Sequence, residues 1–139
     1  MIPLWEWCSE RGEGALTEWR DGLGKGDKGR LDAKLLLLGQ AKDPSQMPNF
    51  VQGPINVRGR RFPHIYECKV WGDIPLRLLL CKGPPESEAS LTFLVGARER
   101  GGEFDPRSAP ETAVSRRQQL ADRAARRIPY ESPPKGQAN

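Results

Sequence analysis

The stretch from residue 64 to residue 81 constrains the fold most, because apolar side chains recur at alternate positions on both sides of a short turn. A three-residue connection, Trp71-Gly72-Asp73, would pair Val70 with Ile74 in an antiparallel hairpin. Alternate side chains of a strand share one face of the sheet. The sequence therefore predicts one core-facing surface, made of Tyr66, Cys68, Val70, Leu76, Leu78 and Leu80.

The same register places charged side chains on the opposite face of the hairpin. Glu67 would lie directly across from Arg77, with Lys69 beside them. Six basic and two acidic residues fall between Ile55 and Lys82, so this stretch has a net charge of +4. The whole chain also has a formal net charge of +4. The excess positive charge is thus concentrated in this stretch, and we expect a basic surface there.

Two segments before the hairpin have the spacing of amphipathic helices. Residues 15–23 form the first, and the glycines at 22, 24 and 26 end it. Asp27 can cap a second helix that ends at Gly39. The two helices should form a hairpin whose apolar side is made of Leu16, Trp19, Leu23, Leu31, Leu35 and Leu38.

The remaining elements are shorter or less regular. Residues 4–8 predict an edge strand, and residues 89–95 predict the third strand of an antiparallel meander. Residues 43–63, rich in proline, glycine and asparagine, predict a loop with at most one brief strand. Ser108 and Glu111 have the spacing of a capping box that opens a helix ending near Arg127.

These elements predict an α+β fold. An N-terminal helical hairpin packs on one face of a twisted antiparallel sheet, a C-terminal helix follows, and the opposite face is basic and concave. Residues 1–128 form a single domain, which is an ordinary size for one core. Residues 129–139 are polar and proline-rich, and we expect a flexible tail.

Several functional classes are excluded by composition. No apolar run approaches the ~20 residues that span a bilayer, and the N-terminus lacks the features of a secretory signal, which together predict a cytoplasmic protein. Cys8, Cys68 and Cys81 form no C-x-x-C pair, and His64 is the only histidine, so a zinc site is not expected. We interpret the cysteines as reduced core residues.

His64 and the tryptophans are assigned to packing. His64 shares the alternation of the core-facing Tyr66, which favours a structural role over that of a catalytic base. Trp5, Trp7 and Trp19 fall within predicted elements, where burial is expected.

Three segments together resemble the RelE superfamily of bacterial toxins: Tyr66-Glu67-Cys68-Lys69, Pro75-Leu76-Arg77-Leu78-Leu79-Leu80, and Phe93-Leu94-Val95-Gly96-Ala97-Arg98-Glu99-Arg100. They are similar in order to a tyrosine strand that ends in lysine, a strand with an inner arginine, and a strand that leads into a basic turn. The N-terminal helical hairpin and the late helix after Asp105-Pro106 resemble the HigB branch and its phage-encoded relatives. The resemblance covers residues 4–128.

This resemblance implies a toxin of a type II toxin–antitoxin system. Such a toxin is a metal-free endoribonuclease without a cofactor that cleaves messenger RNA, commonly on the ribosome, and a small helix-turn-helix antitoxin holds it inactive. Carried over to this sequence, the catalytic basic residues are Lys69, Arg77, Arg98 and Arg100. Two positions depart from the family: Phe104 stands where some members have tyrosine, and Glu67 stands where they have a second lysine.

The chemistry suggests a role for each of these residues. Arg77 can bind two phosphate oxygens, and Phe104 can stack on a base but cannot exchange a proton. Arg98 and Arg100 alternate, so both can point into one cleft. The remaining basic run, Arg58, Arg60 and Arg61, would suit sequence-independent contact with RNA.

Each of these roles has a structural alternative. Arg77 would then form an ion pair with Glu67, and Arg98 and Arg100 would belong to a solvated charged turn. The run that begins at Arg58 could instead contact an acidic antitoxin. For the whole chain, the alternatives are a ParE-like inhibitor of DNA gyrase and a phage-derived protein that binds a partner without catalysis.

Overall fold

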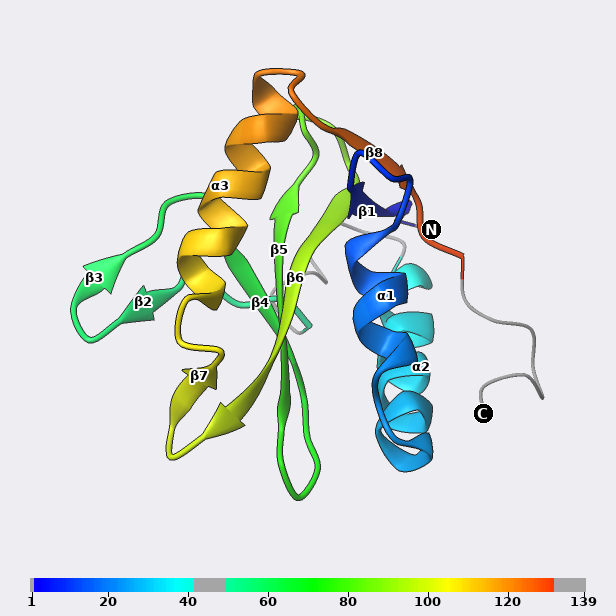
Figure 1. Cartoon of the computed structure of the whole chain (residues 1–139), viewed down its shortest axis with the longest axis vertical. Coiled ribbons are helices and arrows are strands. Elements are labelled where there is room, and N and C mark those ends of the chain that lie inside the picture. Colours follow the sequence, from blue (N-terminus) through cyan, green and yellow to red (C-terminus); the bar gives the residue numbers. More distant parts are fainter. Residues whose placement is uncertain (1, 42–49, 132–139) are drawn as a thin grey trace.

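The computed structural model describes residues 2–41 and 50–131 and shows an α+β fold, as the sequence predicts. Figure 1 shows helices on both sides of a central sheet. The elements are β1 (Leu4–Cys8), α1 (Ala15–Asp21), α2 (Lys25–Gly39), β2 (Asn56–Val57), β3 (Arg60–Arg61), β4 (Tyr66–Val70), β5 (Leu76–Lys82), β6 (Leu91–Arg100), β7 (Glu103–Asp105), α3 (Ala109–Ala121) and β8 (Arg126–Pro129).

The sheet is mixed, whereas the sequence predicts an antiparallel one. Its strand order is β4-β5-β6-β1-β8, and β7 folds back on the end of β6. Strands β4, β5 and β6 form the predicted antiparallel meander, but β1 pairs with β6 in parallel. Strand β8 covers the other side of β1, so β1 is an inner strand and not the predicted edge strand.

The β4–β5 hairpin keeps its predicted faces with a different register. Val70 pairs with Leu76 and Lys69 with Arg77, two residues away from the predicted alignment. Pro75 has no backbone N–H to donate to the ladder, so a wider turn leaves it outside the paired residues. A shift of two residues preserves which side chains share a face, and the predicted core surface is confirmed.

The first core lies between that surface and the helical hairpin. Leu31, Leu35 and Leu38 of α2 are completely or almost completely buried against it, together with Leu16 of α1. The two helices are also joined by a bidentate ion pair in which the Arg20 guanidinium lies 2.8 and 2.6 Å from the carboxylate oxygens of Asp32.

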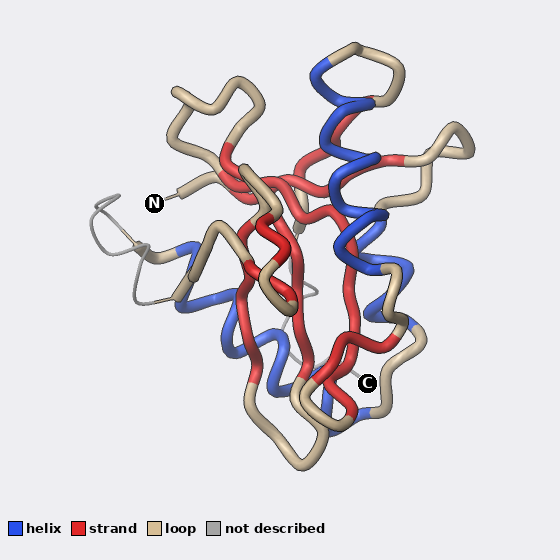
Figure 2. The backbone as a smooth tube through the Cα atoms, turned by 90° about the vertical axis from the view of Figure 1, so that its left-hand side faces the viewer, coloured by secondary structure: helices blue, strands red, loops and turns tan. Residues whose placement is uncertain are grey.

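The opposite face carries a second core, so the prediction of an open basic concave face is wrong for most of its area. Beyond Arg77, strand β5 carries apolar side chains on both faces of the sheet. Those of Leu79 and Cys81 point to this face and belong to the second core. Helix α3 covers this core with Ala109, Ala113 and Leu120. Figure 2 looks onto this face, with α3 to one side and the β2–β3 hairpin in front of the strands.

The C-terminal segment differs most from the prediction. Helix α3 ends at Ala121, short of the predicted end near Arg127, and Arg126 and Arg127 instead begin β8, which pairs with β1. Ser108 is the N-cap residue, but its side chain makes no capping hydrogen bond, so the capping box does not form. Tyr130 is buried in the first core. Residues 129–131 therefore belong to the folded body, and residues 132–139 of the predicted tail lie outside the described residues.

The three cysteines are buried and free, as the sequence predicts. Burial raises the pKa of both Cys68 and Cys81 to about 11. None of the helices in residues 2–41 and 50–131 combines the length and the apolar character needed to cross a bilayer.

Candidate functional site

Lys69 and Arg77 are cross-strand neighbours on the face opposite the helical hairpin. Arg77 binds the Glu67 carboxylate through its Nε and Nη2 atoms, the second at 3.1 Å from Oε1. Lys69 Nζ lies 2.8 Å from Glu99 Oε1, and Arg77 Nη1 lies 3.8 Å from the same oxygen. Two cations and two carboxylates thus form one connected network across β4, β5 and β6.

Phe104 fixes the plane of the Arg77 guanidinium. The carbon at the centre of that group lies 3.6 Å from the centroid of the Phe104 ring. Phe104 is buried, since β7 folds back on β6 and turns the ring inward. Phe104 therefore positions Arg77, and it does not present the free ring face that the predicted stacking on a base requires.

A pocket of about 280 Å³ lies beside this network. Three arginines, Arg58, Arg77 and Arg107, line it around a single carboxylate, that of Glu103. Glu103 forms ion pairs with Arg58 and with Arg107, whose Nη2 lies 2.9 Å from Oε2. Asn56, Val57, Gly102 and Phe104 complete the lining.

The predicted basic cluster is only partly assembled. Arg98 points to the other face of the sheet, where its Nη1 lies 3.0 Å from Asp27 Oδ2 at the start of α2. Arg100 lies near the tip of the β6–β7 hairpin and pairs with Asp105 at 2.7 Å. The alternation of these two residues is as predicted, but it directs them away from Arg77, because Ala97, and not Arg98, is the partner of Arg77.

The loop arginines also separate. Arg58 reaches the pocket, whereas Arg60 stacks on Phe62 and lies 3.4 Å from Glu111. Arg61 is exposed on β3. His64 is exposed as well, with a φ of 71° and its Nδ1 3.2 Å from Glu86 Oε2, so the prediction that it faces the core is wrong.

Two residues of the pocket, Glu103 and Arg107, were not predicted to belong to the site. Both come after β6, and they meet Arg58 only because the β6–β7 hairpin folds toward the β2–β3 hairpin. The one local signal is the Gly101-Gly102 turn, which sends the chain back along β6.

Each arginine of the pocket already has a carboxylate partner, so the site is nearly balanced in charge. An anionic ligand would bind by replacing Glu103 as the ion-pair partner of Arg58 and Arg107. The Glu103 carboxylate would then be free to accept a proton. Within residues 2–41 and 50–131, no three His, Cys, Asp or Glu side chains gather closely enough to hold a metal ion.

Comparison with known proteins finds no family model, no curated protein and no solved structure that matches this chain.

Proposed function

We propose that this protein is the toxin of a type II toxin–antitoxin system, and that it cleaves messenger RNA in the cytoplasm without a metal ion. The observation that carries the proposal is the convergence of Arg58, Arg77 and Arg107 on one pocket around Glu103. Guanidinium groups bind phosphate in a bidentate manner, and three of them can surround the negative charge that builds on a phosphate during cleavage.

The proposed reaction uses the 2′-hydroxyl of RNA as the nucleophile. Glu103 accepts its proton once the phosphate has displaced the carboxylate from the two exposed arginines. The 2′-oxygen attacks the adjacent phosphorus, the bond to the 5′-oxygen breaks, and water supplies the proton to that leaving oxygen. The products are a 2′,3′-cyclic phosphate and a 5′-hydroxyl.

In this mechanism Arg77 is the fixed part of the site. Glu67 and Phe104 hold it from two sides, and its side chain is only 15% exposed. Arg58 and Arg107, at 72% and 81% exposure, are the adaptable part. The partners that fit the proposal are messenger RNA on the ribosome and a small helix-turn-helix antitoxin.

The proposal is tested by inducing the protein in bacteria and following growth and transcript integrity. Arg107→Gln should relieve growth arrest without loss of folding, because the side chain is exposed and its only ion pair within residues 2–41 and 50–131 is with Glu103. Arg60→Gln is the matched control, an exposed arginine outside the pocket, and should remain toxic.

Full toxicity of Arg107→Gln together with Arg58→Gln would overturn the site assignment. DNA damage without transcript loss would favour gyrase inhibition. Absence of both arrest and cleavage would favour a protein that binds a partner without catalysis.

A further inference from the structure

A second pocket, of about 460 Å³, lies at the edge of the sheet between α1 and α3. Strand β1 pairs with β6 only as far as Phe93, and β7 pairs with β6 only from Arg98 onward. Between these points no described strand pairs with this edge of β6. Figure 1 shows this part of β6 with α1 to one side and α3 to the other.

The edge of β6 that no described strand pairs with presents backbone groups to the pocket at Gly96, which is itself buried. The N–H of Glu99 donates to the carbonyl of Pro75 on the β5 side, at 2.9 Å. Strand alternation then directs the N–H and the carbonyl of Gly96 to the opposite edge, where the pocket lies. An adjacent donor and acceptor of this kind can pair with the edge of a nucleobase.

Aromatic and cationic side chains flank Gly96. The Trp19 ring lies so close to it that a Cβ atom at this position would come within 2.2 Å of the ring. From the other side, the Arg116 guanidinium stacks on Trp7, with its central carbon 4.2 Å from the ring centroid. A planar group that enters beside Gly96 would thus lie between an indole and a guanidinium, both of which stack on nucleobases.

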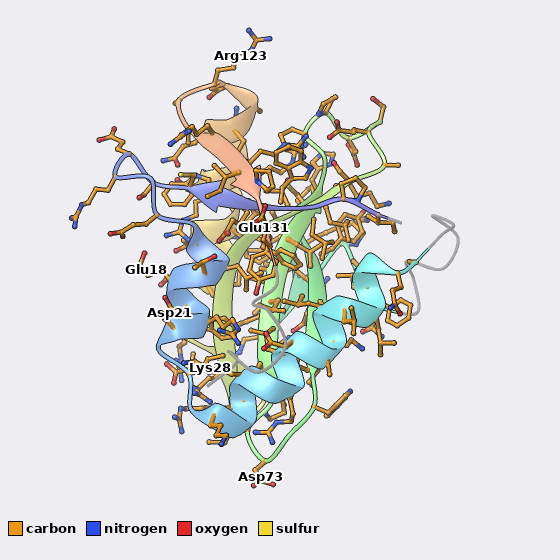
Figure 3. All side chains as sticks on the ribbon, turned by 90° about the vertical axis from the view of Figure 1, so that its right-hand side faces the viewer. Glu18, Asp21, Lys28, Asp73, Arg123 and Glu131 are labelled. Atoms are coloured by element: carbon orange, nitrogen blue, oxygen red, sulfur yellow. The ribbon has the colours of Figure 1, made fainter. Side chains whose placement is uncertain are left out.

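Arg116 differs from the arginines of the first site because it has no carboxylate partner among the described residues. One of its Nη atoms donates to the carbonyl of Leu94 at 2.7 Å, which leaves most of its five donors unused. Burial lowers the pKa of this guanidinium, and the carboxylate of Glu18 opposes that effect. Among the described residues that line the pocket, Glu18 is the only one with a carboxylate, and Figure 3 shows it on α1.

From this arrangement we infer that the pocket binds a nucleotide, with the base beside Gly96 between Trp19 and Arg116 and the phosphate on the free donors of Arg116. Its volume is within the usual range of small-ligand sites, about 300–1,000 Å³. The site is distinct from the Arg77 pocket. The nucleotide can be free or part of a single strand of RNA, since both present the same base and phosphate.

The test measures binding of adenosine monophosphate, uridine monophosphate and a short single-stranded oligoribonucleotide by calorimetry. Arg116→Gln should weaken binding about tenfold, the effect of losing one charge-assisted hydrogen bond. Arg117→Gln is the matched control, an arginine on α3 that does not line the pocket, and should bind like the unmodified protein.

Because Arg116 packs on Trp7, its substitution could perturb folding, and a second measurement is made on the unmodified chain. Nuclear magnetic resonance should show the Gly96 N–H and the indole N–H groups of Trp7 and Trp19 shifting together during titration. Equal affinity for mononucleotides and the oligoribonucleotide would identify a free nucleotide as the ligand. Much tighter binding of the oligoribonucleotide, weakened by Arg116→Gln, would identify an RNA strand.

No binding, or shifts confined to the surroundings of Arg77, would overturn the inference. Arg107→Gln separates it from the proposed cleavage activity. That variant should lose toxicity while its affinity at the Gly96 pocket stays unchanged. A chain that is not toxic but still binds nucleotides at Gly96 would contradict the proposed function alone.

Discussion

The ion pair between Arg77 and Glu67 should be strongly coupled, so that removing both partners costs less than the sum of the losses from removing each one alone. The side chains are 15% and 13% exposed, and Arg77 donates two hydrogen bonds to the Glu67 carboxylate. Arg77→Met would remove that cation and leave a mostly buried carboxylate without its partner. Lys69 cannot replace the cation without leaving Glu99.

The size of the effect follows from the exposure of the pair. Breaking a fully buried ion pair costs about 3–5 kcal/mol, and breaking an exposed one costs about 0–1 kcal/mol. Partial exposure places Arg77→Met at about 2 kcal/mol in free energy of unfolding. Glu67→Gln should cost about 1 kcal/mol, because the amide still accepts a hydrogen bond. The double variant should lose ~1–2 kcal/mol less stability than the sum of the two single losses.

Urea unfolding followed by tryptophan fluorescence measures all four proteins of this cycle. If the loss of stability in the double variant equals the sum of the two single losses to within about 0.5 kcal/mol, the pair is not coupled. That result would refute the reasoning that Glu67 positions Arg77. The double variant also lacks Arg77 and should lose no more stability than Arg77→Met alone, so its toxicity can be compared with that of Arg77→Met at similar or higher stability.

Three further predictions follow from burial. Gly96→Ala should lower stability by about 1–3 kcal/mol and alter tryptophan fluorescence, because the new Cβ overlaps the Trp19 ring; an unchanged thermal midpoint would contradict this packing. Cys68 and Cys81, with pKa values of about 11, should react with a disulfide reagent at pH 8 only after urea is added. Burial raises the pKa of Tyr130 to about 12, above its unfolded value of about 10, so the folded state retains a proton that the unfolded state loses. Stability should therefore fall between pH 10 and pH 12, and Tyr130→Phe should remove that slope.

Alternation made the two faces of the β4–β5 hairpin predictable, because side-chain direction depends only on local strand geometry. The register was not predictable to the same degree, since it depends on where Pro75 leaves the ladder. The parallel pairing of β1 with β6 joins residues about ninety positions apart in the sequence, and no local pattern encodes it. For the same reason, the pairing of residues 126–129 with β1 was not predictable, and the helix was expected to continue to about Arg127.

The candidate site was likewise predictable where its residues are close in sequence and not where they are distant. Lys69 and Arg77 were predictable as neighbours because they belong to one hairpin. Glu103 and Arg107 are four residues apart in one segment, but Arg58 comes from the turn between β2 and β3, and only the folded chain brings it to them. Arg98 was assigned to the same cluster as Arg77 on the family resemblance and on its alternation with Arg100, whereas the strand turns it toward Asp27 on the other face.

The most direct test of the proposed function is the chemistry of the RNA ends produced when the chain is induced in bacteria. Cleavage by the 2′-hydroxyl predicts new transcripts that carry a 5′-hydroxyl, with 2′,3′-cyclic phosphates on the upstream fragments. Glu103→Gln should abolish these ends, while Arg60→Gln should leave them unchanged. Transcript ends that carry a 5′-phosphate, or that persist in Glu103→Gln, would contradict cleavage at the Arg58–Arg77–Arg107 pocket.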